Sequence, residues 1–173
     1  MTQELIDLRN SILEGRYEDA LAIVDELEGM SKQATLRAIE SFLNRMLIHL
    51  IKNQVEQRLT NSWAASIRDS LREIQKLNLK DNKTSHYINA DEWEAAIEDE
   101  LEGAIRTASV EVANGAYTPS QLSEIVDRNH LVQIAKQLLN LTYLHSRKDL
   151  PVAIDDYFSQ LPGGEDWQLG RRQ

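Results

Sequence analysis

Cysteine is absent from the 173 residues of this chain, which also has only three prolines and seven glycines. Without cysteine it can form no disulfide, no thiolate zinc site and no cysteine nucleophile. Apolar runs are short as well: Met46-Leu47-Ile48, for example, ends at His49, so no segment is expected to span a membrane. The N-terminal residues Met-Thr-Gln-Glu-Leu-Ile-Asp lack the basic start of a secretory signal. These absences predict a soluble cytoplasmic protein.

Charge is abundant but unevenly distributed. Nineteen Lys and Arg side chains stand against 28 Asp and Glu, which leaves a net charge of −9. Residues 1–30 and 89–115 are acidic, with net charges of −6 and −7, whereas residues 31–88 carry +5. Either the basic segment packs between the two acidic ones, or each block is a solvated helix face. Net charge of this kind bears on solubility and association rather than on fold.

Helical periodicity dominates the apolar pattern. Apolar residues recur three and four positions apart, and no stretch alternates with period two over more than four residues. We therefore predict an all-α fold, a helical bundle of about six helices with one long central helix. The expected helices cover residues 2–14, 17–28, 31–57, 61–78, about 90–114, and 118 onward, the last broken near 127–130 and resumed over 131–144.

Local signals set several of the expected helix ends. Gly15 and Gly29 are each expected to end a helix, because glycine readily adopts the backbone conformation that follows a last turn. Asn61 is the expected N-cap of the helix that it begins. The segment Thr118-Pro119-Ser120-Gln121 combines an N-cap, a proline at the first helical position and a glutamine at N3, which is a strong start signal.

The apolar stripes predict which side chains form the core. In the first two helices the residues expected to face inward are Leu5, Leu8, Ile12, Leu13, Ala20, Leu21, Val24 and Leu27. In the long third helix they are Leu36, Ile39, Leu43, Met46 and Leu50. In the fifth expected helix, over about 90–114, they are Trp93, Ile97, Leu101, Ala104, Ala108 and Val112. Trp63 and Trp93 stand at helix starts on apolar stripes, so both are expected in the core.

Several segments resemble one bacterial family. They are Asp25-Glu26-Leu27-Glu28-Gly29-Met30-Ser31, Met46-Leu47-Ile48-His49-Leu50-Ile51-Lys52, Ser62-Trp63 and Tyr117-Thr118-Pro119-Ser120-Gln121-Leu122. An acidic segment, a His-Leu-Leu-Lys type helix and a basic stretch ending in Ser-Trp are similar to the family catalogued as domain of unknown function 29, which is common in cyanobacteria. The resemblance covers about residues 4–130 and implies an all-helical fold with no established activity. One departure is Asn53, where the family usually has an aromatic residue.

His49 and Arg45 form the one pair in the chain that suggests catalysis. They lie four residues apart, on the same side of the expected long helix. An Arg–His pair is the catalytic arrangement of some all-helical toxin ribonucleases, although those enzymes usually have four to six residues between the two. The alternative to this small helical nuclease or hydrolase is that His49 is a hydrogen-bonded structural residue on the flank of the apolar stripe.

Cofactor and metal sites have no support in the sequence. Di-iron helical bundles need Glu-x-x-His pairs on two helices, and no such pair occurs. The Glu98-Asp99-Glu100 and Glu102 cluster is typical of a solvated face. Gly-x-Ser-x-Gly and glycine-rich phosphate loops are also absent. We expect no cofactor and no metal.

A basic side is expected on the helix over 61–78 and the loops around it. Its cations are Arg58, Arg68, Arg72, Lys76, Lys80 and Lys83, and Trp63 could offer a stacking surface. Nucleic acid would bind such a patch, but a net charge of −9 repels polyanions and disfavours that partner. Pairing with acidic helices of the same chain is the alternative. Arg68 and Arg72 remain candidates for contacts with a protein partner.

The C-terminal segment holds the remaining candidate. We expect a helical bundle domain over residues 1–149 and a C-terminal extension or tail over residues 150–173. Trp167 is the large apolar residue of its polar end, either a docking anchor for a partner or a residue that folds back on its own domain. The sequence thus favours a non-enzymatic interaction module that binds an unknown protein partner or associates with itself.

Overall fold

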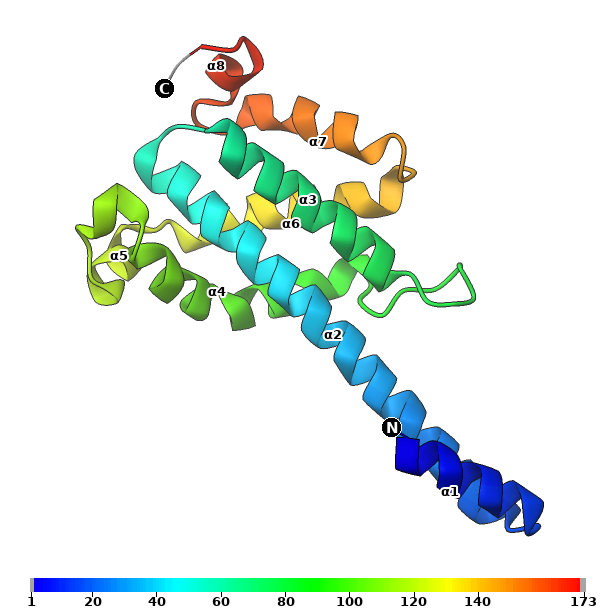
Figure 1. Ribbon diagram of the computed structural model, residues 1–173. Helices are drawn as coiled ribbons and strands as arrows, with labels where there is room; N and C mark the ends of the chain where they lie inside the picture. Colours follow the sequence, from blue (N-terminus) through cyan, green and yellow to red (C-terminus); the bar gives the residue numbers. More distant parts are fainter. Residues whose placement is uncertain (1, 172–173) are drawn as a thin grey trace. The chain divides into compact units, whose positions relative to one another are not determined.

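The computed structural model describes residues 2–171, and the fold of this part of the chain is all-α, as predicted (Figure 1). It contains eight α-helices and three short 3-10 helices but no β-strand. The α-helices are α1 (Thr2–Leu13), α2 (Tyr17–Glu56), α3 (Asn61–Asn78), α4 (Trp93–Ser109), α5 (Pro119–Ile125), α6 (Arg128–Leu144), α7 (Leu150–Tyr157) and α8 (Gly164–Gln168). The 3-10 helices are η1 (Ala90–Glu92), η2 (Val112–Gly115) and η3 (Phe158–Gln160). None of the helices described is long and apolar enough to cross a membrane.

The chain separates into two compact units, the first ending at Ala38 and the second beginning at Ile39. In the first unit, α1 and the start of α2 form a helical hairpin. Gly15 ends α1 as predicted, with a φ of 73°. The amide of Gly15 donates to the carbonyl of Ile12 at 3.2 Å, and the amide of Arg16 donates to the carbonyl of Ser11 at 2.8 Å. These bonds form a Schellman turn, which reverses the chain within three residues.

The predicted helix end at Gly29 is wrong. One helix, α2, runs without interruption from Tyr17 to Glu56, so the separate helices expected over residues 17–28 and 31–57 are a single element of 40 residues. A glycine inside a helix costs only about 1 kcal/mol relative to alanine. The strong helix formers on both sides of Gly29 outweigh that cost.

The inward face predicted for the first two helices is also wrong in part. Ser11 and Ala20 are buried, whereas Leu5, Ile12, Leu13 and Leu21 are 52, 49, 74 and 63% exposed. A hairpin of two helices can bury only the faces that the helices turn toward each other. The small side chains of Ser11 and Ala20 occupy that buried face, which leaves the four large ones in water.

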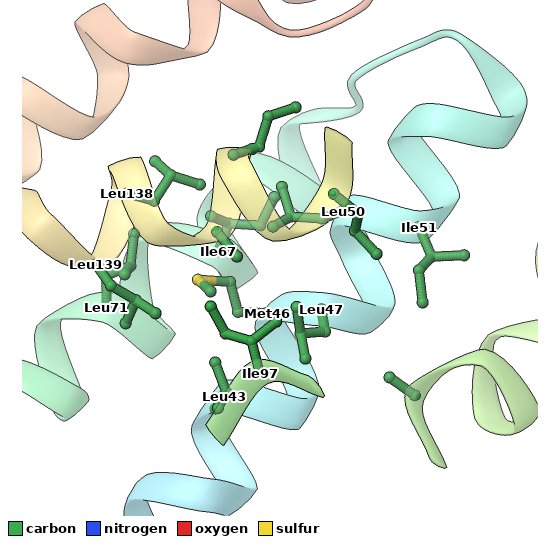
Figure 2. Packing of buried hydrophobic residues seen from close by; sticks show 14 of the residues in the cluster. Leu43, Met46, Leu47, Leu50, Ile51, Ile67, Leu71, Ile97, Leu138 and Leu139 are labelled. Atoms are coloured by element: carbon green, nitrogen blue, oxygen red, sulfur yellow. The ribbon is translucent and has the colours of Figure 1, made fainter. Parts of the chain in front are cut away.

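The second unit contains the hydrophobic core. Residues 39–56 of α2 supply Leu43, Met46, Leu47 and Leu50 to it, and each of these side chains is at most 1% exposed. They pack with side chains from α3, α4 and α6, among them Ile67, Leu71, Ile97, Leu138 and Leu139 (Figure 2). The core line predicted for the fifth helix is confirmed, since Trp93, Ile97, Leu101, Ala104, Ala108 and Val112 are all buried. Trp63 is half-buried at the edge of the core.

Hydrogen-bonding side chains cap the N-termini of α5 and α3 in the second unit. The Oγ1 of Thr118 accepts from the amide of Gln121 at 3.2 Å, and the side chain of Gln121 accepts from the amide of Thr118, which is the capping box expected here. The N-cap of α3 is Thr60 rather than Asn61, because the Oγ1 of Thr60 accepts from the amide of Trp63 at 3.1 Å.

The segment from residue 150 packs into the second unit. Leu150, Ile154, Phe158 and Leu161 are buried in the core cluster. Gly164 fits closely against the backbone here, since a Cβ at this position would lie 1.6 Å from the carbonyl oxygen of Phe158. A glycine is therefore required where α8 begins.

Candidate functional site

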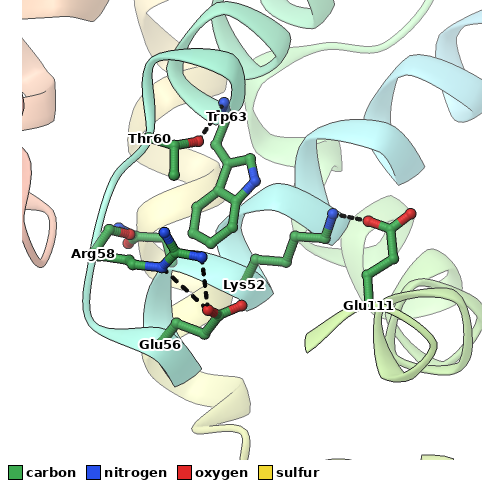
Figure 3. A network of polar contacts seen from close by, with 7 residues as sticks. Lys52, Glu56, Arg58, Thr60, Trp63 and Glu111 are labelled. Carbon is green, nitrogen blue, oxygen red and sulfur yellow. Dashed lines mark hydrogen bonds and ion pairs between the residues drawn. The ribbon is translucent and has the colours of Figure 1, made fainter. Parts of the chain in front are cut away.

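A cluster of polar and aromatic side chains lies at the edge of the second unit (Figure 3). Its members, which we call the Lys52 cluster, are His49, Lys52, Arg58, Trp63 and Glu111. His49 and Lys52 come from α2, Arg58 from the loop after it, and Trp63 from the first turn of α3. Glu111 lies between α4 and η2. The cluster thus joins residues 49–63 to Glu111, which is distant in sequence.

Lys52 is the most deeply buried cation of the cluster, with 6% of its surface exposed. Its ammonium group donates to the carboxylate of Glu111 and forms an ion pair with it. The pair is unequal, because the side chain of Lys52 is 8% exposed and that of Glu111 is 64% exposed. The hydrogen bond from Lys52 and its positive charge lower the pKa of Glu111 below the ordinary glutamate value. Glu111 is therefore the compensating charge for a buried lysine.

Trp63 lies between two cations. The Nζ of Lys52 is 5.8 Å from the centre of the indole ring, and the guanidinium carbon of Arg58 is 4.8 Å from it. These are cation–π distances. Glu56 holds Arg58 in place, since the Nε and Nη2 of Arg58 donate to one carboxylate oxygen at 3.1 and 3.0 Å. The ring thus presents an aromatic surface with fixed positive charge around it.

His49 lies one turn before Lys52 and is half-buried. Its Nδ1 is buried and has no hydrogen-bond partner among the described residues. Burial, together with the charges of Lys52 and Arg45, lowers the pKa of His49 to about 4, and the charge of Glu111 opposes this shift. The imidazole is therefore neutral at pH 7.

The structure places Arg45 and His49 on the same helix but gives them different surroundings. The Nε of Arg45 donates to the Oγ of Ser66 at 2.8 Å, and Arg45 is exposed. Neither Arg45 nor His49 lines the two surface hollows of about 540 and 400 Å³. The catalytic role suggested by this pair stays a prediction.

Backbone strain accompanies Glu111. The helix expected to continue to residue 114 ends instead at Ser109. After Val112, the residues Ala113, Asn114 and Gly115 all have positive φ, at 49, 58 and 76°. Alanine rarely adopts this region, and each non-glycine residue held there costs about 1 kcal/mol. A strained turn therefore follows the carboxylate that pairs with Lys52.

The three residues predicted to contact a partner are all engaged within the second unit. Arg68 donates to Asp155 at 2.9 Å, and Arg72 lies 3.7 Å from Asp69 on its own helix. Trp167 folds back: its ring meets Phe158 edge to face at 5.3 Å, and its Nε1 donates to the Oδ1 of Asn61 at 3.2 Å. Trp167 also lines the hollow of about 400 Å³ together with Leu59, Thr60, Asn61, Gly170 and Arg171.

A second surface was missed because its residues were assigned to the core. Seven of the twelve exposed large apolar side chains of residues 2–171 lie within residues 2–38. Six of them, which we call the hairpin surface, are Leu5, Ile6, Ile12, Leu13, Tyr17 and Leu21, with exposures from 47 to 74%. At 100° per residue, the four on α1 span an arc of about 120°. Tyr17 and Leu21 lie one turn apart at the start of α2. This clustering in so short a segment could have been found by asking which element would cover the stripe.

Metal binding finds no geometric support in residues 2–171, where no three His, Cys, Asp or Glu side chains come together in a way that could hold an ion. The acidic residues around Glu102 instead form separate contacts. Glu102 accepts from Arg128 at 2.8 Å, and Glu94 accepts from Lys136 at 3.1 Å. Some of the acidic block therefore pairs with cations of α6.

Comparison with known proteins gives a family but no function. The model of the family described as Domain of unknown function DUF29 matches residues 14–131. This chain therefore belongs to the DUF29 family, as its sequence resemblance indicated. The chain has no match among curated proteins and none among solved structures. The matched range includes all five residues of the Lys52 cluster and, within the hairpin surface, Tyr17 and Leu21.

Proposed function

We propose that this protein is a non-enzymatic interaction module of the cytoplasm and that the hairpin surface binds a helix of a partner protein. The observation that carries the proposal is the concentration of exposed large apolar side chains in residues 2–38. Single exposed leucines are ordinary on protein surfaces, but clustered ones mark interaction sites. Covering the exposed part of one such side chain contributes about 1–2 kcal/mol. A few of them could supply most of the free energy of a specific contact.

The charge of the hairpin selects the kind of partner. Residues 1–38 contain eight acidic and four basic side chains. One of the basic ones, Arg16, is already paired with Glu14 and Asp19. A partner helix with an apolar stripe and flanking Lys and Arg side chains would match both the apolar and the acidic character. A second copy of the same hairpin would bring like charges together, which disfavours self-association through this surface.

The helical form of the surface favours a helical partner. An amphipathic helix can lay its apolar face on an exposed apolar surface, with anchors three and four residues apart. Leu13 and Tyr17 flank the turn between the helices, and Leu21 follows Tyr17 by one turn. A helix that docks here would therefore contact residues on both sides of the turn.

Calorimetric titration of the full chain with synthetic helical peptides tests the proposal. One peptide has leucines along one face and Lys and Arg on the flanks, and a second has the same leucines with Glu on the flanks. We expect the basic peptide to bind and the acidic one to bind much more weakly. Leu13→Ser and Leu21→Ser leave the net charge unchanged and should each weaken binding about tenfold or more, since each removes one leucine from the contact.

Leu144→Ser is the matched control for these variants. Leu144 is 65% exposed, as Leu21 is at 63%, but it lies on α6 in the second unit. Binding that falls equally in Leu144→Ser and Leu21→Ser would overturn the proposal, because it would be insensitive to the hairpin surface. A dimer in sedimentation equilibrium that Leu21→Ser dissociates would also overturn it, since the occupant would then be a second copy.

A further inference from the structure

The ion pair between Lys52 and Glu111 has the features of a binding site that is occupied by the protein's own carboxylate. The cation is buried, since Lys52 lies near the C-terminal end of α2 and is 6% exposed. The anion is peripheral, since the side chain of Glu111 is 64% exposed and lies outside any helix. Here only the lysine depends on the contact.

Strained backbone follows Glu111. Two residues on, the chain enters three successive left-handed residues, beginning with Ala113 at φ 49° and ψ 41°. This conformation is unfavourable for alanine, so the turn beside Glu111 stores strain. Glu111 would need only to swing into the water that already surrounds most of its side chain.

The surroundings of Lys52 offer further contacts to an incoming carboxylate. An ammonium group has three N–H donors. Among the described contacts of Lys52, Glu111 is the one acceptor. One turn away, the buried Nδ1 of His49 has no hydrogen-bond partner among these residues. A neutral imidazole can donate from one ring nitrogen, which suits the second oxygen of a carboxylate. Trp63, with Arg58 at 4.8 Å from its ring, adds an aromatic wall and a second positive charge.

We propose that Lys52, His49 and Trp63 form a binding site for a ligand carboxylate, and that Glu111 masks this site until the ligand displaces it. The bound carboxylate takes the place of the Glu111 carboxylate on Lys52, so the buried lysine is never left without a counter-ion. Because Glu111 is attached to the same chain, it competes at a high effective concentration. The native protein therefore binds a simple carboxylate weakly, and a variant without this competitor binds it more tightly. The site lies within residues 39–173 and does not depend on the hairpin surface.

The test is a titration of the full chain with sodium acetate, with sodium chloride at the same ionic strength as the reference. The readout is the NMR signal of the Trp63 indole N–H, assigned by its loss in Trp63→Phe. We expect Glu111→Gln to bind acetate about tenfold or more tightly than the native chain, because the intramolecular competitor is gone. Glu111→Asp, which keeps the charge on a shorter side chain, should fall between the two. Adding Lys52→Met to Glu111→Gln should abolish the response.

Glu94→Gln is the matched control. Its carboxylate pairs with Lys136, whose side chain is 35% exposed and needs no counter-ion from the protein. This variant should bind acetate no better than the native chain. Equal affinity in Glu111→Gln and the native chain would overturn the proposal. A response that chloride reproduces would overturn it as well, since the site would then not recognise a carboxylate.

Discussion

Lys52 and Glu111, 59 positions apart, form an ion pair in which the lysine is buried and the glutamate is exposed. The contact ties α2 to the turn after α4, and so joins the basic middle of the sequence to one of its acidic blocks. Other cations of the basic segment pair on their own helix, as Arg72 does with Asp69 and Lys76 with Glu73. The alternation of charge blocks thus reflects both contacts between segments and solvated helix faces.

Removing the two partners of this pair should have unequal effects. Glu111→Gln leaves a buried ammonium group without its counter-ion, and we expect it to lower the free energy of unfolding by about 1–3 kcal/mol. Lys52→Met replaces the buried charge with an apolar side chain of similar length and leaves Glu111 in water, so it should change stability by less than about 1 kcal/mol. Urea denaturation of both variants measures the difference. Equal losses would contradict this account of the pair.

His49 should make the protein less stable in acid. The folded pKa of about 4 lies below the ordinary value of 6.5, so the unfolded state takes up a proton at a higher pH than the folded state. The stabilisation is complete above pH 6.5 and is lost as the pH falls to about 4, a difference of at most about 3 kcal/mol, which solvent screening at this half-buried group reduces. Denaturation at pH 7 and pH 4 should therefore show a smaller pH dependence in His49→Asn than in the native chain. A direct NMR titration of the imidazole with a pKa near 6.5 would contradict the prediction.

Two glycines should respond in opposite ways to alanine. Gly29 lies inside α2 and a Cβ there meets nothing within 4 Å, so Gly29→Ala should stabilise the fold by about 0.5–1 kcal/mol. Gly164 has the carbonyl oxygen of Phe158 1.6 Å from its Cβ position, so Gly164→Ala should destabilise the fold by about 1–3 kcal/mol. Thermal unfolding of the two variants gives the signs, and a stabilised Gly164→Ala would show that this contact can relax.

Trp167 should act within its own unit rather than as an anchor for the peptide. Trp167→Ala removes the contact with Phe158 and the hydrogen bond to Asn61, and should lower the free energy of unfolding by about 1–3 kcal/mol. Asn61→Ala, which removes only the hydrogen bond, should cost no more than about 1 kcal/mol. Neither variant should weaken the binding of the basic peptide. A loss of peptide affinity in Trp167→Ala alone would show that the C-terminal segment takes part in binding.

Local sequence signals predicted much of the fold of the second unit. The capping box at Thr118 and the apolar line that begins at Trp93 depend on interactions within a few turns, and both are present. The end predicted at Gly29 failed because a single glycine is a weak helix breaker in a favourable context. The stripe that includes Leu5 and Leu13 is amphipathic, as predicted, but periodicity cannot show whether another element covers it.

The candidate sites were harder to predict, because they depend on how the fold brings separate segments together. Trp63 was assigned to the core because it lies on an apolar stripe, yet its place between Lys52 and Arg58 depends on how the loop before α3 runs. The pairing of Lys52 with Glu111 joins residues that have no local relationship in sequence. The sequence also pointed to His49, but the depressed pKa of this residue arises from burial that only the fold creates.

The central claim is that the hairpin surface is where a partner helix binds. Amide hydrogen exchange of the full chain, measured with and without the basic peptide, tests it most directly. The account predicts that the peptide adds protection within residues 2–38, on both sides of the turn at Gly15. Added protection confined to residues 39–171 would contradict it.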